Sequence, residues 1–383
     1  MNKLRITSIT SVAVMLLSLT GLAISPAGAA VDRTGKTCVQ EGRVVNSGGV
    51  TYTCAYTKSG LVYSQGRKLS GSLTVVCGAM ENWCAAMTKA FTKKTGVETK
   101  FVRLSSGETV ARLNAAKANP EFGVWHGGPA DGFGVARLDG LIEKYESPTR
   151  HMIPAKYQDT DGYWTGVYVG ALGFCSNKKE LARLGVPVPK SWADLLNPKL
   201  KGQISSAHPS TSGTAFTTLW TQVTRLGGVE PGMAYMKKLH NNILQYTKSG
   251  TAPGQIAGRG EVAVGIIFSH DCVAYREQGL PLTVSFPSEG TGYEIGGVAL
   301  VKGAKNPEAA KAYIDFTLSA EAQNLGPTVA SYQVLTNPRA KLDRRMVTLK
   351  KLTIVDYDFG KASAAKKALT TRFDTEIAVA PKV

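Results

Sequence analysis

The pattern of hydrophobic and polar residues changes twice along the 383-residue chain. Residues 12–24 are one apolar run between basic residues and small residues, which is typical of a cleavable export signal. Residues 31–70 alternate polar and apolar positions between glycine-containing turns, which predicts a small β-meander. We therefore expect a signal peptide at 1–30, a small Cys-containing β-hairpin module at 31–70 and a larger body at 71–383.

Predicted strands and helices alternate along this body. Apolar runs at 73–77 and 262–268 predict strands, and residues 83–94 have the spacing of an amphipathic helix. Residues 307–318 also predict a helix, with Pro307 in its first turn. Such alternation is typical of α/β folds, in which helices cover both faces of a parallel sheet. A body of about 310 residues exceeds what one hydrophobic core usually holds, so we expect two α/β lobes.

The composition indicates a globular protein and limits the kinds of partner that it could bind. Hydrophobic residues make up 43% of the chain, which excludes a disordered chain. Lys and Arg number 45 against 28 Asp and Glu, and the net charge of +17 suits nucleic acid, an anionic surface or an anionic small ligand. Because an export signal is expected, we expect no nucleic acid partner and a periplasmic or extracellular protein associated with the cell surface.

The chain has six cysteines, and an even number of cysteines in an exported chain indicates disulfides. Six cysteines allow fifteen pairings. Their grouping along the chain favours three bridges: Cys38–Cys54, Cys77–Cys84 and Cys175–Cys272. A metal site is the alternative, but the sequence has no Cys-x-x-Cys, and its five His do not cluster with Cys.

Three loops that precede predicted helices are rich in small hydroxylic residues. Helix starts offer free backbone N–H groups and the positive end of the helix dipole, and an anion satisfies both. Each loop alone could be an ordinary helix cap, and the first has the S-x-x-E spacing of a capping box. Together they predict an anion held by uncharged donors. The residues are Ser105, Ser106, Ser212, Gly213, Thr214, Thr247 and Ser249.

Two acidic residues supply a second kind of chemistry. Asp271 follows His270 directly after the predicted strand at 262–268, and Glu294 stands in a glycine-flanked segment. Carboxylates accept hydrogen bonds from ligand hydroxyls, and a buried carboxylate left unpaired is costly. The alternatives are a helix N-cap for Asp271 and a solvated turn for Glu294. Anion donors on one side and carboxylates on the other suit a sugar phosphate.

The body resembles a known family of binding proteins. From about residue 71 to 335 it is similar to periplasmic-type solute-binding proteins of ABC transporters, in the branch called ferric-iron type. Some members of that branch bind hexose phosphates or aminoethylphosphonate instead of iron. The segments that carry the resemblance are CGAMENWCAAM, SSGETVARL, VWHGGPAD, WTGVYVGALGF, STSGTAFTTL, YTKSGTAPGQIAGRGE, SHDC and EGTGYEIGG.

The resemblance implies a two-lobed periplasmic-binding-protein-like fold of type II, with a hinge that closes the lobes on a ligand. Lobe 1 would comprise about 71–165 and 292–383, and lobe 2 about 166–291. The module at 31–70 lies outside the usual pattern of the family.

The resemblance also implies which ligand chemistry to expect. Iron-binding members use two adjacent tyrosines where this chain has His270-Asp271, and this chain has no adjacent Tyr pair. We therefore expect no metal and no cofactor. Hexose-phosphate binders are similar to this chain in having His-Asp followed by a Glu, which here is Glu294. The family pattern further places near the cleft Glu81, Gly127, Gly128 and Asp131.

Several functions remain possible on these grounds. Our main expectation is a monomeric binding protein, not an enzyme, that captures a small anion and delivers it to the membrane permease of an ABC importer. Ferric iron or aminoethylphosphonate is the alternative ligand. A secreted phosphatase is a further alternative, although no base partners Ser105 or Ser212 in sequence and Gly-x-Ser-x-Gly is absent. Adhesion through the basic 31–70 module is the third.

Overall fold

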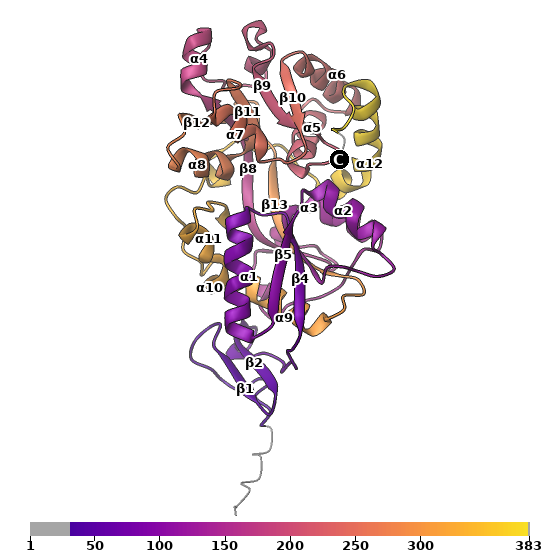
Figure 1. The fold of residues 1–383 in the computed structure, drawn as a ribbon, viewed down its shortest axis with the longest axis vertical. Coiled ribbons are helices and arrows are strands. Elements are labelled where there is room, and N and C mark those ends of the chain that lie inside the picture. Colours follow the sequence, from indigo (N-terminus) through magenta and orange to yellow (C-terminus); the bar gives the residue numbers. More distant parts are fainter. Residues whose placement is uncertain (1–30, 382–383) are drawn as a thin grey trace, which may run out of the picture.

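The computed structural model describes residues 31–381, which form a small module and two stacked lobes (Figure 1). The signal peptide expected at 1–30 lies outside the described residues. Among the residues described, no helix is long and apolar enough to cross a membrane.

One mixed sheet runs through both lobes. Its main strand order is β10-β9-β11-β8-β13-β6-β4-β5, and β7, β12 and β14 pair at its sides. The strands of this sheet are β4 (Ser72–Cys77), β5 (Glu98–Arg103), β6 (Val124–Pro129), β7 (Ile142–Glu143), β8 (Thr165–Asn177), β9 (Ile204–Ala207), β10 (Ile243–Thr247), β11 (Val264–Phe268), β12 (Leu282–Ser285), β13 (Tyr293–Val301) and β14 (Val334–Leu335).

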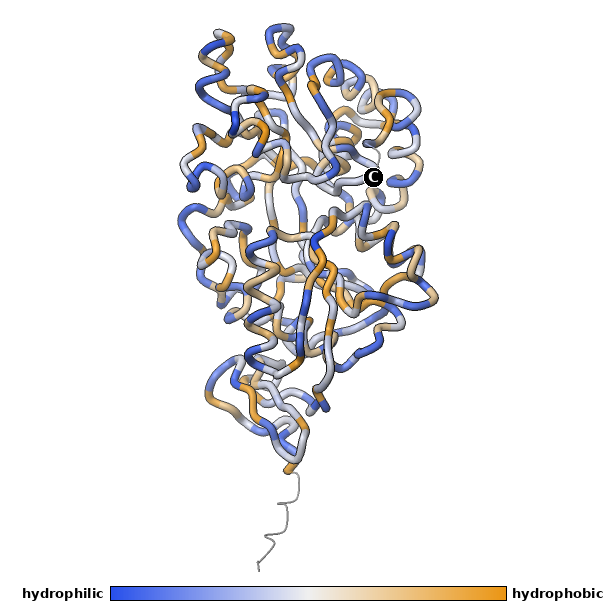
Figure 2. Tube along the Cα trace, viewed as in Figure 1, coloured by the Kyte–Doolittle hydropathy of each residue, from blue (hydrophilic) through white to orange (hydrophobic). Residues whose placement is uncertain are grey.

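Helices cover this sheet in both lobes (Figure 1), and hydrophilic and hydrophobic residues alternate along them (Figure 2). The helices are α1 (Glu81–Thr95), α2 (Ser106–Ala115), α3 (Ala130–Leu138), α4 (Lys178–Leu184), α5 (Gly213–Arg225), α6 (Val229–His240), α7 (Ala252–Gly258), α8 (Ser269–Glu277), α9 (Pro307–Thr317), α10 (Ala320–Gln323), α11 (Leu325–Thr328) and α12 (Phe359–Glu376). The helices predicted at 83–94 and 307–318 are α1 and α9. The strand predicted at 262–268 begins at Val264 and is β11.

Two strands, β8 and β13, join the lobes. The first part of β8 pairs with β13, and its last part pairs with β11 in the other lobe. All thirteen residues of β8 are buried, so the strand can cross between the lobes without exposing apolar surface. Glu294 lies inside β13 and is buried, so the solvated turn considered for it is wrong.

Each lobe has its own hydrophobic core. Trp83 and Trp125 are fully buried in lobe 1, on opposite faces of its sheet, and Trp192 is fully buried in lobe 2. Helix α12 contacts both lobes, because it packs along α3 of lobe 1 and places Phe373 in the core of lobe 2. The chain therefore ends in a helix that bridges the two cores.

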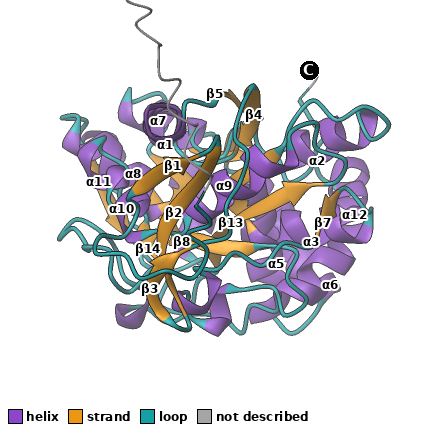
Figure 3. Cartoon of the chain, turned by 90° about the horizontal axis from the view of Figure 1, so that it is seen from below, coloured by secondary structure: helices purple, strands orange, loops and turns teal. Residues whose placement is uncertain are grey.

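The module at 31–70 folds as the three-stranded antiparallel sheet β1 (Val44–Ser47), β2 (Val50–Thr57) and β3 (Gly60–Tyr63). It lies at the end of lobe 1 remote from lobe 2 (Figures 1 and 3). Arg67, whose side chain is only 10% exposed, bridges to Glu308 at 2.7 Å and to Asp315 at 3.3 Å. Lys94 of α1 donates to the backbone oxygen of Gly42 at 2.6 Å. The module is thus fixed to lobe 1, far from the space between the lobes.

All three expected disulfides are present: Cys38–Cys54, Cys77–Cys84 and Cys175–Cys272. The first closes the module. The second ties the end of β4 to α1, and the third ties β8 to α8 across 97 residues. The last two therefore fix elements whose ends meet between the lobes.

Candidate ligand-binding site

A cavity lies between the lobes and is lined by residues of both. Its walls come from the carboxyl ends of strands and the starts of the helices that follow them, which is where open α/β sheets bind ligands. Nine of the residues that the sequence predicted line this cavity. They are Ser105, Ser106, Gly128, Ser212, Gly213, Thr214, His270, Asp271 and Glu294.

One side of the cavity is formed by two helix starts from different lobes. Ser105 caps α2 in a capping box with Glu108, and Ser212 caps α5 by accepting from the backbone N–H of Ala215. The two starts are close, because a Cβ built on Gly213 would lie 2.9 Å from Ser106 Oγ. Hydroxyl and backbone N–H donors of both helices therefore converge, which is the arrangement that suits an anion.

Arg103 contributes a positive charge that the sequence analysis missed. Among the described residues that line the cavity it is the single Lys or Arg. It is the last residue of β5, paired in register with Cys77 at the end of β4. The signal that could have found it is its position, because a basic residue at the carboxyl end of a parallel strand points to the ligand-binding edge. The sequence analysis expected uncharged donors and did not include this cation.

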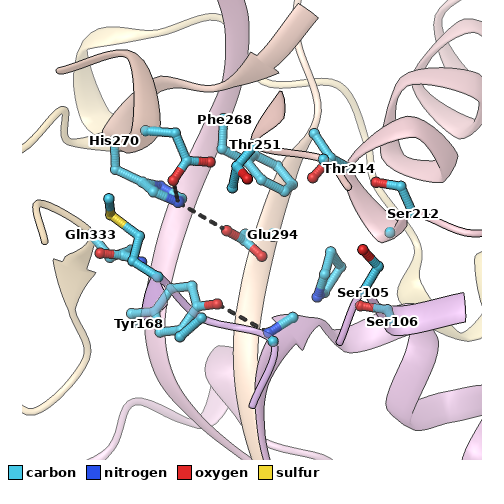
Figure 4. Close-up of a pocket in the computed structure, with 18 of the residues that line it drawn as sticks. Ser105, Ser106, Tyr168, Ser212, Thr214, Thr251, Phe268, His270, Glu294 and Gln333 are labelled. Carbon is cyan, nitrogen blue, oxygen red and sulfur yellow. Dashed lines mark hydrogen bonds and ion pairs between the residues drawn. The ribbon is translucent and has the colours of Figure 1, made fainter. Parts of the chain in front are cut away.

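The opposite side of the cavity holds three titratable groups. Asp271 and His270 lie in the first turn of α8, and His270 Nε2 is 3.6 Å from both Asp271 Oδ1 and Glu294 Oε1. Figure 4 shows the serine hydroxyls on one side, His270 and Gln333 on the other, and Glu294 between them. His270, Asp271, Glu294 and Gln333 are each at least 95% buried.

Burial shifts the pKa values of these groups away from their charged forms. It lowers the pKa of His270 to about 3 and raises that of Asp271 to about 7, against the opposing charge of Arg103. The pKa of Glu294 is raised well above its usual value, first by burial and then by the charges of Asp271 and Asp131. Simultaneous ionisation of Asp271 and Glu294 on this side of the cavity is therefore disfavoured.

Several polar atoms around the cavity have no protein partner. They are Asp271 Oδ1 and Gln333 Nε2, whereas His270 Nδ1, also without a partner, lies against Gly170. Buried polar groups are usually hydrogen-bonded, so unpartnered atoms beside a cavity indicate where a ligand would supply the partner. Gln333, only 1% exposed, was missed by the sequence analysis, and so was Tyr168, whose hydroxyl accepts from the Gly128 N–H at 3.0 Å.

Five predicted residues lie outside the cavity lining. Glu81 and Ser249 line an open groove next to it. Thr247 donates its hydroxyl to the backbone oxygen of Ser249, and Gly127 packs against Ala79. Asp131 faces α12 instead, where its carboxylate is 3.3 Å from Lys366 Nζ. The carboxylate of Asp131 is thus committed to an ion pair between elements and not to the cavity.

The lobes touch directly beside the cavity. The backbone N–H of Gly107 donates to the backbone oxygen of Thr211 at 3.0 Å, and Ser105 Oγ donates to the backbone oxygen of Lys248 at 3.3 Å. Both bonds join α2 of lobe 1 to loops of lobe 2. They belong to a closed arrangement, since separating the lobes would break them.

Gly107→Ala is expected to disfavour this closed arrangement. Its added Cβ would overlap the backbone oxygens of Ser210 and Thr211 in the other lobe, and backbone atoms cannot turn aside. Overpacking of this kind costs roughly 1–3 kcal/mol, so ligand affinity should fall by about 5- to 150-fold. The unfolding temperature without ligand should stay near wild type, and Gly360→Ala, at an exposed glycine of α12, is the control. Calorimetric titration measures the affinity, and an unchanged value would contradict this closure contact.

The lobes, the crossing strands and the enclosed polar cavity define a two-lobed ligand-binding protein of the type II periplasmic-binding-protein fold. The chain belongs to the bacterial extracellular solute-binding protein family, whose sequence profile matches residues 135–362. It is therefore an exported solute-binding protein of an ABC importer, a class that binds small ligands and works with a membrane permease.

Three relatives are similar over most of the chain. The first is the periplasmic binding protein AfuA from Actinobacillus pleuropneumoniae, whose structure was determined with exogenous fructose-6-phosphate bound. Its sequence is 42% identical, and its structure superposes with a TM-score of 0.78 over 81% of this chain and 99% of AfuA. The periplasmic binding protein P5PA is 36% identical with a TM-score of 0.77, covering 80% of this chain and all of P5PA. An uncharacterized protein of Haemophilus influenzae is 40% identical over 339 residues, which are 86% of this chain and 98% of that protein.

Proposed function

We propose that this protein captures a hexose phosphate for import. The observation that carries the proposal is the division of the cavity into two chemical halves, with the helix starts on one side, His270 and the adjacent Asp271 on the other, and Glu294 between them. Arg103 supplies the one positive charge in the described part of this lining. The fructose-6-phosphate bound to AfuA, which is 42% identical to this chain, supports the same choice of ligand.

In this proposal the phosphate group lies between the starts of α2 and α5. Its oxygens accept from the hydroxyls of Ser106, Ser212 and Thr214 and from free backbone N–H groups, while Arg103 offsets its charge. Hydrogen bonds to a charged group contribute ~1.5–3 kcal/mol each, so a few of them suffice for tight binding. Closure of the lobes removes water and strengthens each of these interactions.

The sugar end would be selected by the polar wall opposite. Asp271 Oδ1 and Gln333 Nε2 need partners, and sugar hydroxyls can donate to the first and accept from the second. An anion without hydroxyls leaves these buried atoms unpaired, and such mismatches discriminate strongly between ligands. Selectivity for a sugar therefore follows from the wall, and attraction for any phosphate follows from the helix starts.

A thermal-shift panel tests the proposal with fructose 6-phosphate, glucose 6-phosphate, 2-aminoethylphosphonate, inorganic phosphate and ferric citrate. A ligand at one hundred times its dissociation constant stabilises the folded protein by ~2.7 kcal/mol, which is a clear shift. We expect the hexose phosphates to give the largest shifts. A shift with 2-aminoethylphosphonate or ferric citrate alone would overturn the proposal.

Asp271→Ala is expected to separate the two halves of the site. Loss of a buried hydrogen-bonded charge should weaken fructose 6-phosphate binding by ~1.5–3 kcal/mol, or about 10- to 150-fold. Inorganic phosphate does not need the sugar wall, so its affinity should change less than about threefold. Calorimetric titration measures both, with Glu121→Ala, which removes an exposed carboxylate, as the control. Equal losses for both ligands would contradict the assigned role of Asp271.

A further inference from the structure

The lining of the closed cavity has more carboxyl groups than cationic side chains, and a bound hexose phosphate adds further negative charge. Its walls carry one cation, Arg103, and two carboxyl groups, Asp271 and Glu294. Above a phosphate pKa of about 6 the ligand adds two negative charges. With every group ionised, the cavity would enclose a net charge of −3, and like charges in a dry site repel strongly. A proton taken up on closure would relieve this repulsion.

His270 is poorly placed to carry that proton as an imidazolium. Its Nδ1 has no hydrogen-bond partner and lies against Gly170, where a built Cβ would be 2.5 Å away. A proton on Nδ1 would therefore bury an unsatisfied N–H group, which is costly. Burial accordingly lowers the pKa of His270 to about 3. The neutral ring can direct an Nε2–H toward the two carboxyl groups, which lie 3.6 Å away.

Glu294 is better placed than Asp271 to be the neutral carboxyl. Its carboxyl and that of Asp271 on α8 both lie 3.6 Å from His270 Nε2. Glu294 of β13 also experiences the charge of a second acid, Asp131 of α3, which is paired with Lys366 of α12. The remaining titratable groups that face it are His270, Tyr168 of β8 and Arg103 of β5. Burial and both neighbouring acids raise its pKa, and only Arg103 opposes them.

We propose that Glu294 becomes protonated when the lobes close on a hexose phosphate, so that capture of this ligand takes up one proton from solvent. This inference rests on the proposed function. The protonated Glu294 presents an O–H donor beside the carboxylate acceptor of Asp271. The pair can then bind both a hydroxyl hydrogen and an oxygen of a sugar. A ligand with an ammonium group would instead favour ionised Glu294 and take up no proton.

The sign of the pH dependence follows directly. Opening of the lobes admits water to Glu294 and moves its pKa back toward that of a free glutamate, so Glu294 is ionised at pH 7 to 8 in the open form. Because its pKa is higher in the closed complex, binding consumes a proton and weakens by about tenfold for each pH unit. Glu294→Gln mimics the protonated side chain permanently and avoids this cost. It should therefore bind fructose 6-phosphate at least tenfold more tightly than wild type at pH 8, with a flat pH profile.

Calorimetric titration of the wild-type chain with fructose 6-phosphate at pH 8, in buffers of different ionisation enthalpy, measures the proton count. We expect uptake of about one proton by wild type and about none by Glu294→Gln. The control is Glu98→Gln, which makes the same charge change at the exposed start of β5 and should keep the uptake.

The possible results distinguish a failure of the proton-uptake inference from a failure of the proposed function. Tight binding without proton uptake would overturn this inference and leave the proposed function standing. Uptake that persists in Glu294→Gln would place the proton on the ligand or on Asp271 and also overturn it. Weaker binding by Glu294→Gln than by wild type at pH 8 would show that the ionised carboxylate is needed. Wild type that does not bind fructose 6-phosphate at all would remove the proposed function and this inference together.

Discussion

Arg103→Met is expected to weaken the binding of fructose 6-phosphate and of inorganic phosphate by ~2–5 kcal/mol, which is roughly 30- to 4,000-fold. Methionine keeps much of the apolar stem but removes the cation that offsets the phosphate charge. It also removes the charge that holds down the pKa values of Asp271 and Glu294. A dianion would then enter a closed cavity with two acids and no Lys or Arg in its described lining.

The measurement is calorimetric titration with both ligands at moderate salt. Lys100→Met is the matched control, because Lys100 lies on the same strand but its side chain is 74% exposed. The control should stay within about twofold of wild type, since exposed charges contribute little. Affinities that survive Arg103→Met would mean that uncharged donors suffice, as the sequence alone had suggested. A loss confined to the sugar phosphate would place Arg103 against the sugar instead of the phosphate.

The parts of the cavity that could be predicted from sequence are those whose chemistry is local. Ser105, Ser106 and Ser212 stand before helices in patterns that have a direct structural meaning, and the structure brings both helix starts to one cavity. His270 and Asp271 follow a buried strand directly, and such strand ends gather at one edge of a sheet. Local pattern and sheet geometry together were sufficient for these residues.

Other positions depend on contacts that no local pattern contains. Asp131 opens a helix after a buried strand, as Asp271 does, yet its side chain faces α12 because Lys366 is there. Gln333 reaches the cavity from the segment between α11 and β14, which has no recognisable motif. The disulfide and strands of the module followed from Cys spacing and alternation, but its docking on lobe 1 did not. That docking relies on Arg67 meeting acids more than two hundred residues later.

Asp131→Asn is expected to have the largest effect on stability, lowering the free energy of unfolding by ~3–5 kcal/mol. Asp131 is fully buried, and the side chain of Lys366 is 9% exposed. The substitution would leave the Lys366 ammonium in a dry site with weaker partners, namely the ring of Phe216 at 4.7 Å and a neutral amide. The pair joins α3 of lobe 1 to the helix that bridges both cores, so the loss should be felt by the whole chain.

Urea unfolding of the single and double variants separates the charge effect from packing. Asp131→Asn combined with Lys366→Met should be more stable than Asp131→Asn alone, because the unpaired charge is gone and an apolar side chain takes its place. Lys361→Met, on the same helix with a 79% exposed side chain, should change stability by less than about 0.5 kcal/mol. The double variant could instead be less stable than wild type, Asp131→Asn and Lys361→Met. The ion pair would then contribute through shape and hydrogen bonding and not through the burial of its charges. The contact between α3 and α12 at Asp131 and Lys366 would then depend on side-chain geometry alone.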